Sequence, residues 1–159
     1  MTNVEIMNYM KRKIEEDPSL AKSEWQGTCN YVVGELVSLK TVDLNEINVD
    51  DVAKPGEMQV VPVELFIAAA TTSFGMTFHL AAHNEGIVID KANIVFSGTF
   101  DKAAFLGMID GYSGITRPML VLSVESSTNK GKLAEIAAIA IERSPVLSGI
   151  KEQVVLHIR

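Results

Sequence analysis

Cysteine is almost absent from this sequence: Cys29 is the only one among 159 residues. A single cysteine cannot form a disulfide within the chain, and it cannot build a zinc site made of cysteines. The nearby residues Tyr31 and Val32 favour a strand, and no basic residue stands beside Cys29 to favour a reactive thiolate. We therefore expect Cys29 to be a small hydrophobic residue of a strand, with a reactive thiol as the alternative.

Positive charge is also scarce. The sequence has 14 Lys+Arg against 20 Asp+Glu, which gives a net charge of −6. The basic residues 11–13 are followed at once by the acidic residues 15–17, a pattern typical of a solvated helix end. A nucleic-acid surface needs concentrated positive charge, so no nucleic-acid partner is expected. A hydrophobic content of 47% excludes a disordered chain, and the length predicts one domain over residues 1–159.

Charge of either sign is missing from residues 65–84, a run about as long as a bilayer span. The run nevertheless contains several polar residues and has no basic flank, which favours a buried helix of a soluble fold over a membrane helix. The first twenty residues lack the unbroken apolar stretch of a signal peptide. We therefore expect a protein of the cytoplasm that has no membrane partner.

Hydrophobic spacing and turn residues predict an α+β fold. Gly34 and Glu35 indicate a hairpin turn, and residues 47–52 indicate a short strand. Pro62 suits the start of a long helix and Gly86 its end. Ser144 and Pro145 end the next helix. The expected order is a helix over 2–16, strands within 23–61, a central helix over 62–85, strands within 87–125, a helix over 130–143 and a strand over 152–158.

The usual catalytic motifs are absent or incomplete. His79 and His83 share one helix face, but no third ligand suggests itself, so a metal site is only the minority interpretation. Ser73 lies in no Gly-x-Ser-x-Gly turn, and His79 projects about 240° away from it around a helix. No phosphate-binding loop occurs. The turn at residues 107–114 is a candidate binding loop because Tyr112 and Arg117 lie near its ends.

Two segments together resemble the OsmC/Ohr (osmotically inducible protein C-like) family. Residues 62–74 resemble its helix, in which Pro-Glu-Glu-Leu-Phe is followed by small residues and a cysteine. Residues 140–146 resemble its second hallmark, a helix followed by Cys-Pro. The resemblance covers about residues 23–159. It implies an antiparallel-rich sheet wrapped around a long buried central helix, in an intertwined homodimer.

The resemblance also implies a reaction that this sequence lacks the residues to perform. In typical members the first cysteine attacks an organic hydroperoxide and the second resolves the sulfenic acid to a disulfide. Here the two positions are Ser73 and Ser144, and a hydroxyl does not follow the oxidation chemistry of sulfur. The family's glutamate position is Val63, with Glu64 one residue later. The arginine usually supplied from the N-terminal strands has no counterpart between residues 18 and 90. The chain therefore resembles a divergent member that lacks both redox cysteines, and no catalytic residue is assigned.

The leading hypothesis is a binding protein on an OsmC-like scaffold. It would take a small amphipathic or acyl-type ligand at the dimer interface, with a coenzyme A-type compound as one candidate and no required cofactor or metal. The alternatives are a stress-response hydroperoxide reductase that uses Cys29, a structural or regulatory homodimer without a pocket, and a hydrolase that uses Ser73 with a histidine of the other subunit. The expected ligand-binding residues are Ser73, Met76, Thr77, Ser144 and Glu64.

Overall fold

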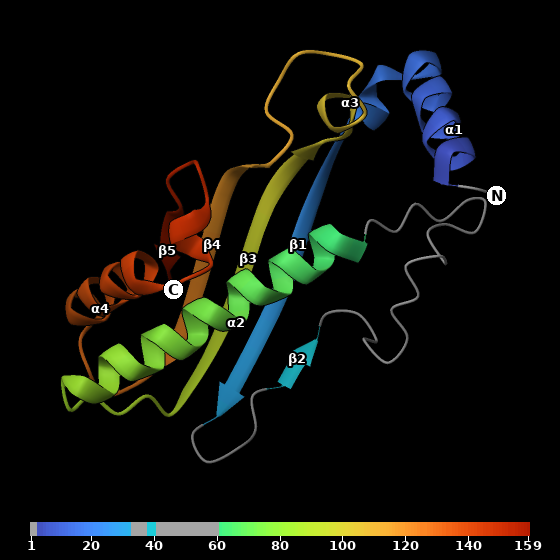
Figure 1. The fold of residues 1–159 in the computed structure, drawn as a ribbon. Coiled ribbons are helices and arrows are strands. Elements are labelled where there is room, and N and C mark those ends of the chain that lie inside the picture. Colours follow the sequence, from blue (N-terminus) through green and yellow to red (C-terminus); the bar gives the residue numbers. More distant parts are fainter. Residues whose placement is uncertain (1–2, 33–37, 41–60) are drawn as a thin grey trace.

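The computed structural model describes residues 3–32, 38–40 and 61–159, and within these residues it is a mixed α+β fold, as the sequence predicts. Figure 1 shows the order of the elements. The helices are α1 (Asn3–Glu16), α2 (Val61–Asn84), α3 (Lys102–Phe105) and α4 (Lys130–Arg143), with short 3-10 turns η1 (Pro18–Ala21) and η3 (Leu147–Gly149). The strands are β1 (Lys22–Val32), β2 (Ser38–Lys40), β3 (Lys91–Asp101), β4 (Ile115–Glu125) and β5 (Val155–Ile158).

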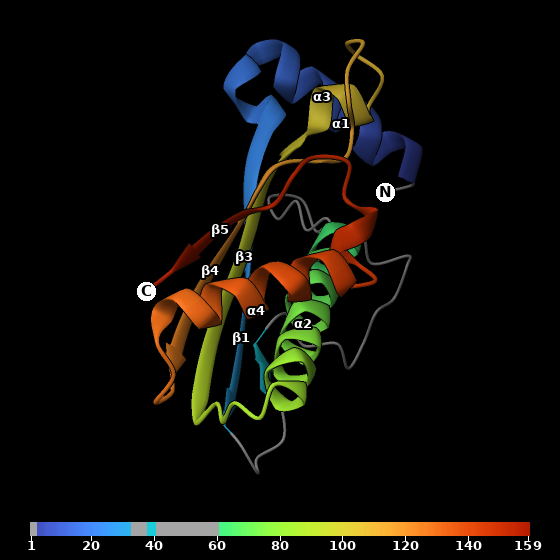
Figure 2. The same ribbon diagram turned by 90° about the vertical axis from the view of Figure 1, so that its left-hand side faces the viewer.

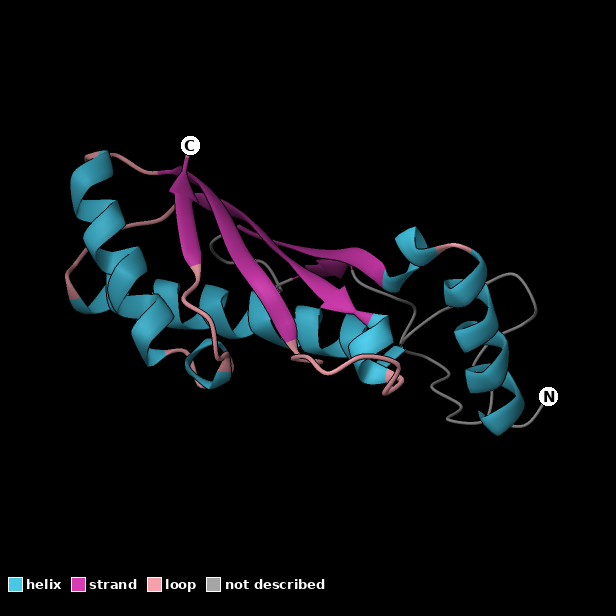
Figure 3. Ribbon diagram, turned by 90° about the horizontal axis from the view of Figure 1, so that it is seen from above, coloured by secondary structure: helices cyan, strands magenta, loops and turns pink. Residues whose placement is uncertain are grey.

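The strands form one sheet in the order β2-β1-β3-β4-β5. The neighbours from β2 to β4 pair antiparallel, whereas β5 pairs parallel to β4. Helices α2 and α4 lie side by side on one face of this sheet (Figure 2). Seen from above, the strands cover the two helices on one side only (Figure 3). The opposite face of β3 and β4 carries no helix among the described residues.

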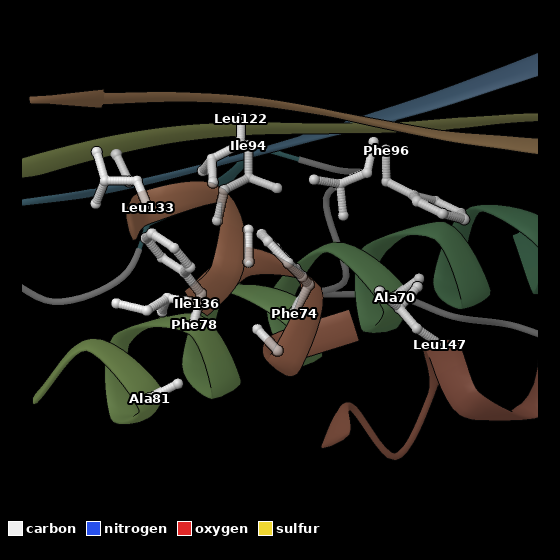
Figure 4. Close-up of a cluster of buried hydrophobic side chains, with 14 of the residues drawn as sticks. Ala70, Phe74, Phe78, Ala81, Ile94, Phe96, Leu122, Leu133, Ile136 and Leu147 are labelled. Atoms are coloured by element: carbon white, nitrogen blue, oxygen red, sulfur yellow. The ribbon is translucent and has the colours of Figure 1, made fainter. Parts of the chain in front are cut away.

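The core lies between this sheet and the two helices. On α2 the buried residues recur every three or four positions, which places them along one helix face (Figure 4). The rings of Phe74 and Phe78 stack with centroids 5.8 Å apart. Each such buried side chain contributes roughly 1.5–3 kcal/mol. The main members are Ile67, Ala70, Phe74 and Phe78 of α2, Ile94 and Phe96 of β3, Leu120 and Leu122 of β4, and Leu133, Ile136, Ala137 and Ala140 of α4.

Helix α1 belongs to a second, smaller cluster. Met10 and Ile14 of α1 are buried in a cluster with Ala103 of α3 and with Leu106, the residue that follows α3. The sequence does not show whether this helix packs on its own subunit or on a partner, and within one chain it packs at the α3 end of the sheet.

Two expected strands begin more than one residue away from those observed. Residues 87–89 are not part of a strand: the chain first turns at Gly86, whose φ is +68°, and Ile87 donates a hydrogen bond back to Ala82, so β3 begins only at Lys91. The last strand begins at Val155 rather than at residue 152. The hairpin at Gly34 and the strand at 47–52 lie outside the described residues.

Among the described residues, one helix is long and apolar enough to cross a membrane. It is the stretch Val63–Asn84 of α2, and half of its most apolar 18 residues are buried inside the fold. The core helix of a soluble protein meets the same criteria, so this property is weak evidence for a membrane span.

Candidate functional site

Ser73 and Ser144 meet across the interior, although 71 positions separate them in the sequence. Their Oγ atoms are 2.8 Å apart, a hydrogen-bond distance. Ser73 is half-buried on α2, and Ser144 is fully buried at the residue that ends α4. The structure thus brings together the two serines that the sequence analysis singled out.

The turn after α4 fixes the position of Ser144. Its backbone N–H donates to the carbonyl of Ala140, and its Oγ accepts a hydrogen bond from the backbone N–H of Leu147 at 3.2 Å. Pro145 prevents the helix from continuing. The Ser144 hydroxyl therefore satisfies a buried backbone donor as well as contacting Ser73.

The other small polar residues of α2 are bonded within the helix. Thr71 donates its hydroxyl hydrogen to the carbonyl of Ile67 at 2.7 Å, and Thr77 donates to the carbonyl of Ser73 at the same distance. Because each threonine hydroxyl donates to a carbonyl one turn earlier in the helix, it can lie in apolar surroundings with its donor satisfied. The Thr77 hydroxyl is thus already engaged as a donor.

Met76 and Glu64, the other expected ligand-binding residues of α2, differ in their exposure. Met76 is 66% exposed within one chain. Glu64 is half-buried in the first turn of α2, where its Oε2 atom is buried and has no hydrogen-bond partner among the described residues. Burial raises the pKa of the Glu64 carboxyl above its usual range. Their proposed role in ligand binding stays a prediction.

Neither histidine of α2 belongs to a metal cluster. His79 and His83 are both exposed. Within the part of the chain that the structure describes, no group of three His, Cys, Asp or Glu residues lies close enough to hold a metal ion. Cys29 lies in β1, where it pairs with Ile94 and Leu39, and its side chain is outside the described part of the structure.

A pocket of about 260 Å³ lies beside the first half of α2. Its walls come from α2, the end of β3, the loop before β4 and the turn after α4, and most of them are apolar. Val63, which the resemblance places where the family carries a glutamate, is one of the lining residues. The others are Phe66, Phe100, Tyr112, Ser113, Gly114, Ile115, Gly149 and Ile150.

The pocket and the serine pair share the same helix face and the same turn. Val63, Phe66 and Ser73 follow one another at helical spacing through Ala70, so they project to the same side of α2. Gly149 and Ile150 of the pocket follow Ser144 by one short turn. None of the five expected ligand-binding residues is among those that line this pocket. Of the lining residues, the sequence indicated only the loop that carries Tyr112, and Val63 through the family resemblance.

One aromatic residue at the mouth of this pocket is held in place. The Lys151 ammonium lies 5.0 Å from the centroid of the Tyr112 ring, within the range of a cation–π contact. The Tyr112 hydroxyl packs onto Gly114, where a Cβ atom would collide with it. These two contacts restrict the Tyr112 ring, which lines the pocket.

Comparison with known proteins decides the family. The model of the OsmC-like protein family matches residues 55–159, about two thirds of the chain. The chain belongs to the OsmC-like family. No curated protein sequence matches it.

Two solved structures share the OsmC-like fold. One is an OsmC-like protein from Mycoplasma pneumoniae, with a TM-score of 0.57, 18% identity, and coverage of 69% of this chain and 78% of the other. The second is an OsmC-like hydroperoxide resistance protein from Jannaschia sp. CCS1, with a TM-score of 0.57, 12% identity, and coverage of 84% and 89%. At these identities the likeness shows the fold alone.

Proposed function

We propose that this OsmC-like protein has no thiol peroxidase machinery and binds a small amphipathic or acyl-type ligand in the pocket beside α2. The observation that carries the proposal is the apolar pocket of about 260 Å³ on the same helix face as the Ser73–Ser144 pair. The family's usual thiols are replaced by hydroxyls that bond to each other, while an apolar cavity lies along the same face of α2.

The loss of peroxidase chemistry follows from the atoms at the two positions. A peroxidatic residue must present a nucleophilic thiolate that can be oxidised and then reduced again. The hydroxyls of Ser73 and Ser144 cannot ionise near neutral pH, and they do not form a bond that a reductant can reverse. Val63 places an apolar side chain where the resembling family carries a glutamate.

The size and lining of the pocket indicate the kind of ligand. Phe66, Phe100 and Ile150 provide apolar contact area, and Tyr112 and Ser113 add hydroxyls. Ligand sites for drug-sized molecules usually span about 300–1,000 Å³. A cavity of about 260 Å³ therefore suits an acyl or aryl group, and a coenzyme A-type compound would insert only that end.

The exposed face of α2 supports the proposed homodimer. Met76 and Leu80 are 66% and 58% exposed, and no charged residue occurs between positions 65 and 84. A long helix face that is both uncharged and apolar is typical of an interface. A second copy placed against it would cover these side chains, next to the half-buried Ser73.

The ligand proposal is tested by blocking the pocket. Gly149 lines the pocket, and a Cβ atom added there would meet nothing within 4 Å, so Gly149→Phe should fill the space without a backbone clash. Denaturing the purified protein and analysing the released small molecules by mass spectrometry should yield an amphipathic compound from wild type and not from Gly149→Phe. Val88→Phe, at a 64% exposed residue outside the pocket, is the matched control and should retain the compound. Equal recovery from both variants would contradict the proposal.

The dimer is tested separately. Met76→Glu places a charge on the exposed face of α2 and should convert a dimer to monomer in light-scattering measurements. Val88→Glu adds the same charge to an equally exposed apolar residue outside α2 and should leave the mass unchanged. A monomeric wild-type protein would contradict this part of the proposal.

A further inference from the structure

A second pocket, of about 230 Å³, lies on the opposite side of the sheet from α2. Ser97 and Thr99 of β3 line it, and they alternate with Phe96 and Phe100, which belong to the core. Because successive side chains of a strand point to opposite faces, this pocket opens on the helix-free face of the sheet. It is therefore distinct from the pocket of the proposed function. The remaining lining residues are Glu24, Gly98, Arg117 and Met119.

A β-bulge places Arg117 at this pocket. Ser97 pairs with Met119 and Thr99 pairs with Thr116, so β4 has one residue more than β3 across this step. Arg117 and Pro118 together lie opposite Gly98, and the φ of 50° at Arg117 makes it the one described non-glycine residue in the left-handed region. That conformation is costly for a residue with a side chain, and bulges of this kind re-aim a side chain.

Two hydrogen bonds hold Arg117 in this geometry. Its backbone N–H donates to Oε2 of Glu152 at 2.7 Å, and its Nη2 donates to Oγ1 of Thr99 at 2.7 Å. A guanidinium carries five N–H donors, and Thr99 accepts only one of these hydrogen bonds. The planar fork is thereby fixed over the pocket, where it can bind a carboxylate through two parallel hydrogen bonds.

A negative charge lies on the other side of the same strand. Glu24 of β1 pairs directly with Thr99, and β3 separates it from Arg117 on β4. Within the described part of the chain, Glu24 and Arg117 do not form an ion pair with each other. Farther along the same face Lys91 and Glu125, on adjacent strands, do form an ion pair at 3.5 Å. Glu24 and Arg117 are thus held one strand apart, so a ligand that carries both charges can contact both.

We propose that this pocket binds a small zwitterion of the α-amino acid type. Its carboxylate would lie on the Arg117 guanidinium and its ammonium on the Glu24 carboxylate. The hydroxyls of Ser97 and Thr99 form the floor between them, and Met119 provides an apolar wall for the side chain of the ligand.

The test uses three probes that differ by one group each: L-leucine, 4-methylpentanoate, which lacks the ammonium, and 3-methylbutylamine, which lacks the carboxylate. Titration followed by two-dimensional amide NMR should show shifts for residues 24, 97–99 and 117 with millimolar L-leucine. Each of the other two probes lacks one charge-assisted hydrogen bond, so each should bind at least about tenfold more weakly than L-leucine. No shifts with L-leucine, or equally tight binding of 4-methylpentanoate, would overturn the proposal.

Variants assign the two charges. Arg117→Gly removes the guanidinium and tolerates the left-handed backbone, so it should fold and lose L-leucine binding. Glu24→Gln should weaken L-leucine binding by at least about tenfold and leave the binding of 4-methylpentanoate unchanged. Glu125→Gln, on the same face but in the ion pair with Lys91, is the control and should bind like wild type. Unchanged binding in Arg117→Gly would refute the assignment.

Discussion

Replacing both Ser73 and Ser144 by cysteine should create a disulfide. The two Oγ atoms are already 2.8 Å apart, so sulfur atoms at these positions need to approach by only about 0.7 Å more to reach bonding distance. Cys29→Ser should be included, since it leaves the new pair as the only two thiols. Oxidation should then remove two hydrogen atoms from the protein mass and abolish its reaction with a thiol reagent.

The expected stabilisation can be worked from the length of the loop. Residues 73 and 144 are 71 positions apart, and closing a loop of that length lowers the entropy of the unfolded chain enough to stabilise the fold by about 4 kcal/mol at 25 °C. For a chain of this size that corresponds to a rise of roughly 8–16 °C in Tm. The reduced form of the same variant is the control, because it differs only in the bond.

Thermal unfolding of the oxidised and reduced samples measures the effect. No disulfide after treatment with a mild oxidant would refute the reasoning, since it would mean that the two side chains do not meet as described. A disulfide that forms but leaves Tm unchanged would show instead that closing this loop does not stabilise the fold through the entropy of the unfolded chain. Peroxide turnover should remain slow in either case, because Val63 and the uncharged surroundings on α2 give a thiolate no positive partner.

Three further predictions concern single residues. Glu64→Gln should stabilise the protein at pH 7 by of order 1 kcal/mol, because burial raises the pKa of this carboxyl and disfavours its ionised form in the fold. This gain in stability should shrink as the pH falls toward 4.5, since the carboxyl then becomes protonated. Urea unfolding at both pH values measures it. Gly98→Ala should lower stability by roughly 1–3 kcal/mol, because the new Cβ would collide with Cγ2 of Ile115, whereas Gly149→Ala should be nearly neutral. Wild type should not consume cumene hydroperoxide with a thiol reductant; turnover that disappears in Cys29→Ser would favour the alternative function.

Local signals predicted the helices of this fold well. The helix expected over 130–143 is α4, with the same bounds, because Asn129 caps its start by accepting a hydrogen bond from the backbone of Lys132 and Ser144 ends it. Such signals act over a few residues and are therefore visible in the sequence. The resemblance at residues 62–74 and 140–146 predicted the OsmC-like family, and the match of the family model confirms this prediction.

The pockets were less accessible from the sequence because they are assembled from distant segments. Ile115 and Ile150 meet Phe66 only after the sheet has formed, and no periodicity records that contact. Met76 shows the opposite difficulty. It projects only about 60° from Ser73 around α2, yet Ser73 is half-buried and Met76 is 66% exposed within one chain, a difference that helix spacing alone does not predict. The bulge at Arg117 depends on strand register and had no sequence signal.

The serine pair contributes to the packing of α2 against the turn that follows α4. The buried N–H of Leu147 needs an acceptor after α4 ends, and the Oγ of Ser144 provides it while also bonding to Ser73. An alanine at residue 144 would leave that donor unsatisfied, at a cost of roughly 1–3 kcal/mol. A hydroxyl is the smallest side-chain group that supplies this acceptor, so serine preserves the junction between α2 and the turn after α4. Gly149 and Ile150, which follow this junction in the chain, form part of the pocket wall, so Ser144→Ala should also disturb that wall.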